Sequence, residues 1–115
     1  MTINGAHAIL YSTDADATRA ALGGLLGTRS ADAGGGWLIF GLPPAEIAVH
    51  PAGEGGRAEL YLMCDDIEAA VADLTARGIE LTGPVADQGW GLLTGIRLPG
   101  GVELGLYEPR HPTAI

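Results

Sequence analysis

The chain has 115 residues, a length typical of one domain that excludes a second large domain or a repeat array. It carries 6 basic and 14 acidic side chains, for a formal net charge of −8, so it repels phosphate backbones and we expect no nucleic-acid partner. No apolar run reaches the length of about 18 residues that crosses a bilayer, and the first residues lack the pattern of a signal peptide. With one cysteine and therefore no internal disulfide, these features predict a cytoplasmic protein that contacts no membrane.

The first half of the chain predicts one strand, one helix and then further strands. A strand is expected at 6–12, and a helix follows from the capping residue Asp14 to a stop at Gly27. A glycine cluster at 34–36 precedes the apolar run at 37–42 and, after a Pro-Pro turn, the segment 45–51, which we also expect to be extended.

The second half repeats this order after a loop-like linker at 52–57. A strand is expected at 58–64, and Asp65-Asp66 caps a helix that ends at Gly78 and places its apolar residues on one face. Strands are expected at 79–85, 89–99 and 102–109.

A shift of 52 positions places the two halves in register. It aligns Ala6 with Ala58, Leu10 with Leu62 and, as helix caps, Asp14 with Asp66, and gives six identities in the seventeen positions 6–22. The sequence therefore predicts an α+β protein, a single domain over 1–115, built from two tandem βαβββ modules at about 1–52 and 57–110. We expect these modules to form a curved mixed sheet around a cleft.

Alternate residues of a strand point to opposite faces, so each expected strand has an aliphatic face and a mixed face. The mixed faces carry four ionisable groups, which are His7, Glu46, Glu59 and Glu103. The repeat makes His7 equivalent to Glu59 and Glu46 equivalent to Glu103, so a pseudo-twofold axis could bring all four together. A divalent cation would then hold them ionised. The alternative is that they are ordinary polar residues on a solvated sheet face.

The paired βαβββ pattern resembles the vicinal oxygen chelate superfamily, which includes glyoxalase I, bleomycin-resistance proteins and extradiol dioxygenases. The resemblance is carried by the helix DDIEAAVADLTARG after a strand and by the closing LPGGVELGLYEP. It implies that the first and last strands of each module supply metal ligands, here His7, Glu46, Glu59 and Glu103. Glu59 stands where glyoxalase-like members usually have histidine, and Gly100-Gly101 replaces their usual Gly-Asn. Extradiol members need two histidines and one carboxylate, and only one of these four residues is a histidine, which argues against ring-cleaving iron chemistry.

The resemblance implies a metal-dependent lyase or isomerase that acts on a small oxygenated substrate through an enolate-like intermediate. Glu46 and Glu103 would be the catalytic general bases. The oxygen-rich ligand set favours Mg²⁺, Mn²⁺, Ni²⁺, Co²⁺ or Fe²⁺ over a thiolate-type zinc site, with Zn²⁺ still among the candidates. The alternative is a metal-free protein that binds or sequesters a small or cationic molecule, as bleomycin-binding relatives do. The resemblance also implies a homodimer.

Aromatic and sulfur-containing residues are the candidates for ligand contact. Trp37 and Trp90 follow glycines at matched places in the two halves, and either form aromatic walls for a flat ligand or pack in the core or a dimer interface. Three further residues share the mixed face and either line a pocket or fill it, namely Tyr61, Met63 and Tyr107. The tail at 110–115, which contains His111, is expected to be frayed.

Overall fold

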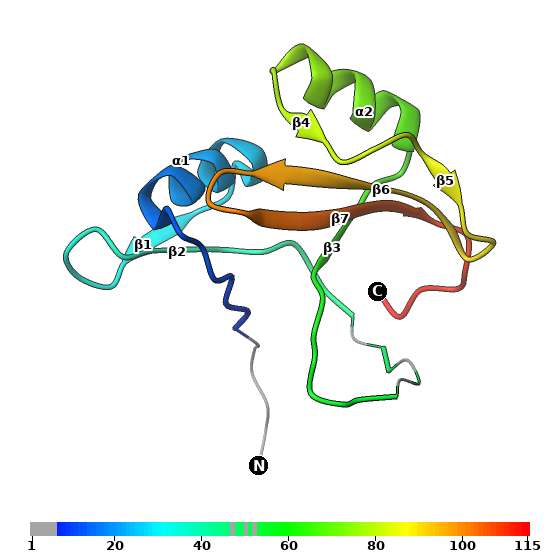
Figure 1. Ribbon diagram of the computed structural model, residues 1–115, viewed down its shortest axis with the longest axis horizontal. Coiled ribbons are helices and arrows are strands. Elements are labelled where there is room, and N and C mark those ends of the chain that lie inside the picture. Colours follow the sequence, from blue (N-terminus) through cyan, green and yellow to red (C-terminus); the bar gives the residue numbers. More distant parts are fainter. Residues whose placement is uncertain (1–6, 47, 50, 52) are drawn as a thin grey trace.

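The computed structural model describes residues 7–46, 48–49, 51 and 53–115, and it shows the expected α+β class. Its elements, in chain order, are α1 (Ala15–Leu26), β1 (Ser30–Asp32), β2 (Leu38–Phe40), β3 (Tyr61–Met63), α2 (Ile67–Ala76), β4 (Glu80–Leu81), β5 (Ala86–Asp87), β6 (Gly91–Leu98) and β7 (Val102–Pro109) (Figure 1). No helix in these ranges is both long enough and apolar enough to span a membrane.

The second half forms a mixed sheet of the expected βαβββ type. Its strand order is β3-β7-β6-β4, with β5 also paired to β6; β3 runs parallel to β7 and the other pairs are antiparallel. Helix α2 connects β3 to β4, and its N-cap residue Asp66 accepts hydrogen bonds from the backbone N–H groups of Glu68 and Ala69. The β6–β7 hairpin is the longest pairing, so it is the framework on which the other strands are placed.

The first half differs from the prediction. Helix α1 has its expected boundaries, because Asp14 accepts a hydrogen bond from Ala17 N and Gly27 adopts the left-handed conformation that ends the helix. Beyond it, however, the described residues form only the short antiparallel pair β1–β2. The expected strands at 6–12 and 45–51 are not found: none of their described residues belongs to a strand, and residues 6, 47 and 50 lie outside the described part.

The physical reason is that strand propensity is realised only beside a partner strand. Residues 7–12 pair with no strand edge, and prolines at 43, 44 and 51 lack the N–H that a ladder needs. A second complete βαβββ module is therefore not clearly formed by the described residues of the first half.

A buried threonine connects the first half to the sheet. Thr18 of α1 donates a hydrogen bond from Oγ1 to the carbonyl of Pro99 at 2.7 Å, in the turn between β6 and β7. Next to it, Thr13 N donates to the carbonyl of Gly100 at 3.1 Å. Gly100 has a φ of +83°, and a side chain at this position would collide with Ser12 Oγ, so glycine is required for this contact.

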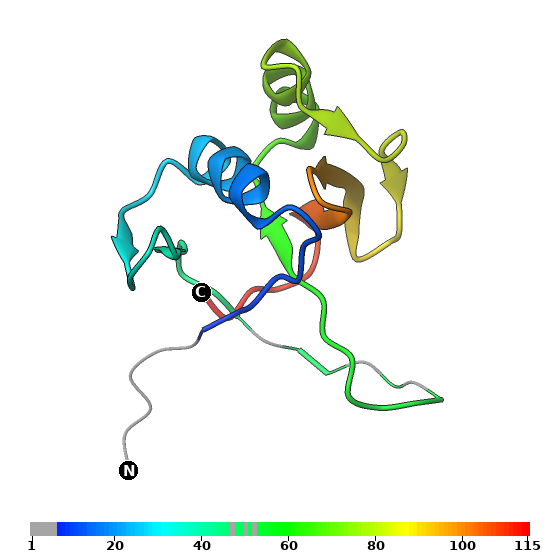
Figure 2. The same cartoon turned by 60° about the vertical axis from the view of Figure 1, so that its left-hand side comes forward.

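The core lies between the helices and one face of the sheet. Figures 1 and 2 show α1 and α2 on the same side of the β6–β7 hairpin. The buried apolar residues between these layers are Ile67, Leu74, Ile96, Leu98, Val102, Leu104 and Leu106. Leu104 and Leu106 of β7 face the helices, as strand alternation predicts, so no helix covers the opposite face of the sheet.

Replacing Ile96 by alanine should reduce the free energy of unfolding by about 2–5 kcal/mol, because its side chain is fully buried and the cavity cannot be filled from outside. The matched control is Ile115→Ala, at a residue that is 57% exposed, which should change stability by less than about 0.5 kcal/mol. Urea unfolding followed by circular dichroism measures both. Equal losses in the two variants would contradict this description of the core.

Candidate functional site

The face of the sheet that points away from the helices carries the candidate site. In the β6–β7 ladder, Gly95 lies opposite Gly105, Leu93 opposite Tyr107 and Arg97 opposite Glu103. On the neighbouring strand Tyr61 is in register with Gly105, and Met63 with Tyr107. Because paired residues share a face, all of these side chains lie on one side, which we call the open face.

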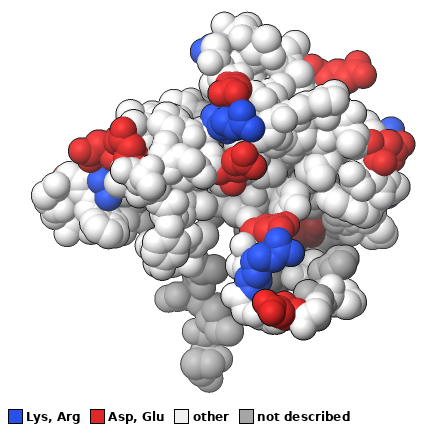
Figure 3. Space-filling view, viewed as in Figure 1, with Lys and Arg blue, Asp and Glu red and all other residues white. Residues whose placement is uncertain are grey.

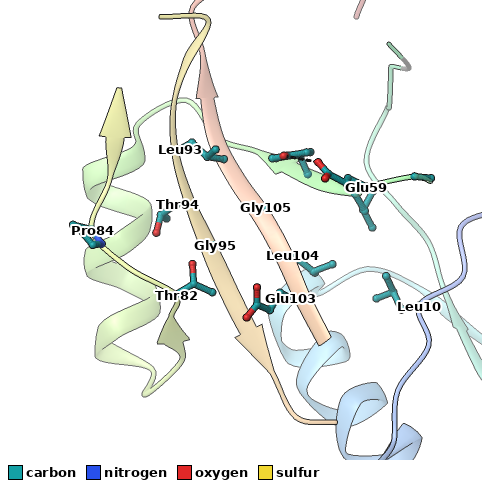
Figure 4. Close-up of a pocket in the computed structure, with 13 residues that line it drawn as sticks. Leu10, Glu59, Thr82, Pro84, Leu93, Thr94, Gly95, Glu103, Leu104 and Gly105 are labelled. Atoms are coloured by element: carbon teal, nitrogen blue, oxygen red, sulfur yellow. Dashed lines mark hydrogen bonds between the residues drawn. The ribbon is translucent and has the colours of Figure 1, made fainter. Parts of the chain in front are cut away.

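A hollow of about 510 Å³, which we call the trough, crosses the open face (Figure 4). Gly95 and Gly105 form its floor. Glu59 and Tyr61 line it on the β3 side, whereas Thr82 and Pro84 line it on the β4 side, and Leu93 and Glu103 stand further along the hairpin. The trough is thus built from the three strands β3, β6 and β7 and from the segments next to β3 and β4.

The two floor glycines determine how the walls lie. A Cβ at Gly105 would collide with the ring of Tyr61, and a Cβ at Gly95 would collide with the side chain of Thr82. Each glycine therefore allows a side chain from the adjacent strand to lie against the backbone. Sequence reasoning missed Gly95, Gly105 and Thr82; glycines inside expected strands were the available signal.

Three aromatic side chains meet at one end of the open face. We call Tyr61, Trp90 and Tyr107 the aromatic cluster. Their ring centroids are 6.4 Å apart for Tyr61 and Trp90, 5.8 Å for Tyr61 and Tyr107, and 5.4 Å for Trp90 and Tyr107, all with edge-to-face geometry. Tyr61 belongs to both the cluster and the trough, so the two features are continuous.

Of the five expected ligand contacts, the structure brings four to the open face and leaves one elsewhere. Met63 lies beside Tyr107 in the ladder. Trp37 instead precedes β2, with the guanidinium of Arg19 stacked over its ring at 5.1 Å from the centroid. It lines a second hollow of about 350 Å³, the apolar groove, between α1, β2 and the inner face of the sheet.

The four expected metal ligands are not brought together. Glu59 and Glu103 both line the trough, but His7 lines the apolar groove. Glu46 accepts a hydrogen bond from Ala114 N at 2.7 Å, in the C-terminal tail. Among the residues that the structure describes, no group of three or more His, Cys, Asp or Glu side chains could hold a metal ion.

The two trough carboxylates already have cationic or hydroxyl partners. Glu59 accepts hydrogen bonds from Arg57 at 2.8 Å and from the Tyr61 hydroxyl at 2.7 Å. Glu103 lies 3.6 Å from Arg97, which also pairs with Glu80 at 2.7 Å. These residues do not fit a metal centre, because a cation at either carboxylate would compete with an arginine. Figure 3 shows the same pattern on a wider scale, with basic side chains next to acidic ones.

Three groups on or next to the open face, Tyr61, Tyr107 and Cys64, have raised pKa values that favour their neutral forms. The hydrogen bond to Glu59 and partial burial raise the pKa of Tyr61, and burial together with the charge of Glu46 raises the pKa of Tyr107. Burial, reinforced by Glu108, also raises the pKa of the Cys64 thiol. Cys64 is therefore not an activated nucleophile, and the tyrosines act as neutral hydrogen-bonding rings.

Comparison with known proteins confirms the resemblance drawn from the sequence. Residues 3–106 match the Glyoxalase/Bleomycin resistance protein/Dioxygenase superfamily, and the chain belongs to that superfamily. No protein with a curated function gives a match.

Two solved structures are similar over nearly their whole length. One is the crystal structure of TnmS3, an antibiotic binding protein from Streptomyces sp. CB03234, with 25% identity, a TM-score of 0.67, and coverage of 95% of this chain and 98% of that chain. The other is a structure from the mobile metagenome of V. Pseudocholerae, with 18% identity and a TM-score of 0.60, covering 94% of this chain and 96% of that one, which supports the fold.

The raised pKa of Tyr61 predicts a loss of stability in alkali. A group with a raised pKa in the folded state stabilises it fully below the unfolded pKa of about 10, and this contribution disappears as pH rises through the folded pKa. The free energy of unfolding should therefore fall above about pH 10, and fall less steeply in Tyr61→Phe, which has no phenol to ionise. Urea unfolding at several values between about pH 8 and 11 measures this. Parallel curves for wild type and variant would show that Tyr61 is not responsible.

Proposed function

We propose that this protein binds a planar aromatic small molecule on the open face, without a metal ion, and sequesters it. The observation that carries the proposal is the continuity of the trough with the aromatic cluster through Tyr61. The similarity to TnmS3, described as an antibiotic binding protein, supports a small-molecule ligand.

The dimensions and chemistry of the site suit such a ligand. A hollow of about 510 Å³ is within the usual range for small-molecule sites, and most of those sites combine apolar and aromatic walls with a few polar groups. The floor glycines let Tyr61 and Thr82 lie against the backbone, so these side chains form the surface that a flat molecule would meet. The edge-to-face arrangement of the aromatic cluster supplies ring surfaces on which a further ring can stack.

The positions of the carboxylates favour binding over a metal-dependent lyase or isomerase. The two expected catalytic residues lie in different settings: Glu103 beside Arg97 in the trough, and Glu46 bonded to the tail. Glu103 lines the trough and Glu46 does not, so the two carboxylates do not share a position at which a substrate could bind between them. Glu59 and Glu103 still give the trough an acidic lining, which favours a neutral or cationic ligand over an anionic one.

The two tryptophans provide an internal test, using 2-naphthol as a planar probe and cyclohexanol as a non-planar control. In ¹⁵N-labelled protein, the indole N–H signal of Trp90 should shift on addition of 2-naphthol, because Trp90 is in the aromatic cluster and Trp37 is not. The Trp90→Phe and Trp37→Phe variants assign the two signals. Replacing Tyr61 by alanine should weaken 2-naphthol binding by about 2–10-fold, the usual worth of an aromatic contact.

A shift of the Trp37 signal without the Trp90 signal would move the ligand to the apolar groove and overturn the proposal. Equal responses to 2-naphthol and cyclohexanol would show that ring stacking does not select the ligand. No response of either signal to 2-naphthol would also count against it.

We further infer a homodimer, in which a second copy covers the incomplete first half. β3 is an edge strand of its sheet, and the first half exposes large apolar side chains, with Tyr11 87% and Val49 96% exposed. An edge strand and exposed apolar residues are both features that a second chain can cover. Pairing of residues 7–12 with a strand of the second copy would complete the tandem-module arrangement expected from the sequence.

Light scattering coupled to size-exclusion chromatography should give about twice the chain mass of 11.7 kDa. Tyr11→Glu should shift the population to the single-chain mass, whereas Ile115→Glu, at another exposed apolar position, should not. A wild-type mass of one chain at about 100 μM, well above the Kd of a stable dimer, would contradict the dimer but leave ligand binding untouched.

A further inference from the structure

The C-terminal tail, residues 110–115, is attached to the aromatic cluster rather than frayed. Arg110 N donates to the carbonyl of Trp90 at 2.9 Å, and the Arg110 guanidinium lies 3.4 Å from Asp87. The ring of His111 stacks on Tyr107 with a centroid distance of 5.9 Å and an interplanar angle of 26°. Further along, Ala114 N donates to Glu46. His111 is thus a fourth ring at the cluster, one that sequence reasoning did not include.

Hydrogen bonds at His111 fix which atoms carry hydrogens. Nδ1 lies 2.7 Å from the carbonyl oxygen of Pro112, which can only accept, so Nδ1 carries the hydrogen. In the neutral imidazole, Nε2 then has only a lone pair. Nε2 lies 3.3 Å from the Tyr107 hydroxyl, so Tyr107 must donate its hydrogen to His111.

This direction leaves the Tyr107 oxygen as an acceptor for anything else that approaches it. Glu46, whose negative charge acts on Tyr107, is an acceptor as well, with one of its oxygens bonded to Ala114 N. Tyr107 and Glu46 are each tied to the C-terminal tail, Tyr107 through His111 and Glu46 through Ala114.

We propose that His111 makes the Tyr107 hydroxyl an acceptor, so that Tyr107 selects planar aromatic ligands that carry a hydrogen-bond donor, such as a hydroxyl or an amine. Tyr107 is the specificity-determining contact, and His111 is a positioning residue. This inference rests on the proposed function, because it assigns the ligand class of the same site.

The experiment compares two probes of the same shape at pH 7: 2-naphthol, which has an O–H donor, and 2-methoxynaphthalene, which can only accept. Wild-type protein should bind 2-naphthol about 2–10-fold more tightly, the usual worth of one hydrogen bond. Titration of the Trp90 indole signal gives both dissociation constants. The measured quantity is their ratio, which a general structural role of the tail would not change.

Two variants separate the hydrogen bond at Tyr107 from packing. His111→Phe keeps a stacked ring but removes Nε2, so Tyr107 is free to donate and the preference for 2-naphthol should disappear or reverse. Tyr107→Phe removes the hydroxyl and should bring the ratio towards one. Urea unfolding of each variant checks that it is folded.

The outcomes distinguish this inference from the proposed function. If wild type binds both probes with equal dissociation constants, donor selection is wrong and aromatic binding stands. If the ratio in His111→Phe equals that of wild type, His111 does not set the direction of the Tyr107 hydrogen bond. If neither probe shifts the Trp90 signal, the proposed function fails and this inference fails with it.

Discussion

The open face depends on the absence of side chains at two directly opposed positions. Gly95 and Gly105 face each other in the β6–β7 ladder, and each is covered by a side chain from the next strand, Thr82 and Tyr61 respectively. Any β-carbon at these positions would lift the covering side chain away from the sheet. Tyr61 would then leave both the trough and its edge-to-face contacts with Trp90. The proposed ligand surface therefore follows from strand register and glycine placement before any functional group is considered.

The sequence predicts the second half far better than the first, because its signals are local. Asp66 caps α2, glycines end the turns, and alternation along 102–109 assigns the faces of β7 without knowledge of its neighbours. In the first half, the capping residues Asp14 and Gly27 correctly predict the ends of α1. Its strands cannot be predicted in the same way, because a strand at 6–12 requires a partner edge that the sequence does not specify. The unpredicted β1 consists of Ser, Ala and Asp, which have little strand preference.

The same distinction explains the site. Strand alternation correctly places Glu59, Tyr61, Glu103 and Tyr107 on one face, since each belongs to the sheet of the second half or lies directly before it. The repeat argument predicts that His7 and Glu46 lie on the same face. The structure places them elsewhere, because residues that are equivalent in the sequence do not form equivalent strands in the two halves. His111 has no periodic signal at all; its position follows from where β7 ends and from the tail contacts around Trp90 and Glu46.

The charge distribution determines which interactions remain for a ligand. The chain is strongly acidic, yet Glu59 is bonded to Arg57 and Tyr61, and Glu103 lies beside Arg97. These exposed pairs contribute little to stability, but they reduce what the carboxylates can offer to an incoming cation. Tyr61, in contrast, is fixed by its hydrogen bond to Glu59, so its ring is already oriented before a ligand arrives. A preoriented ring loses little conformational entropy on binding, so for the proposed ligand we expect stacking to contribute more affinity than the carboxylates do.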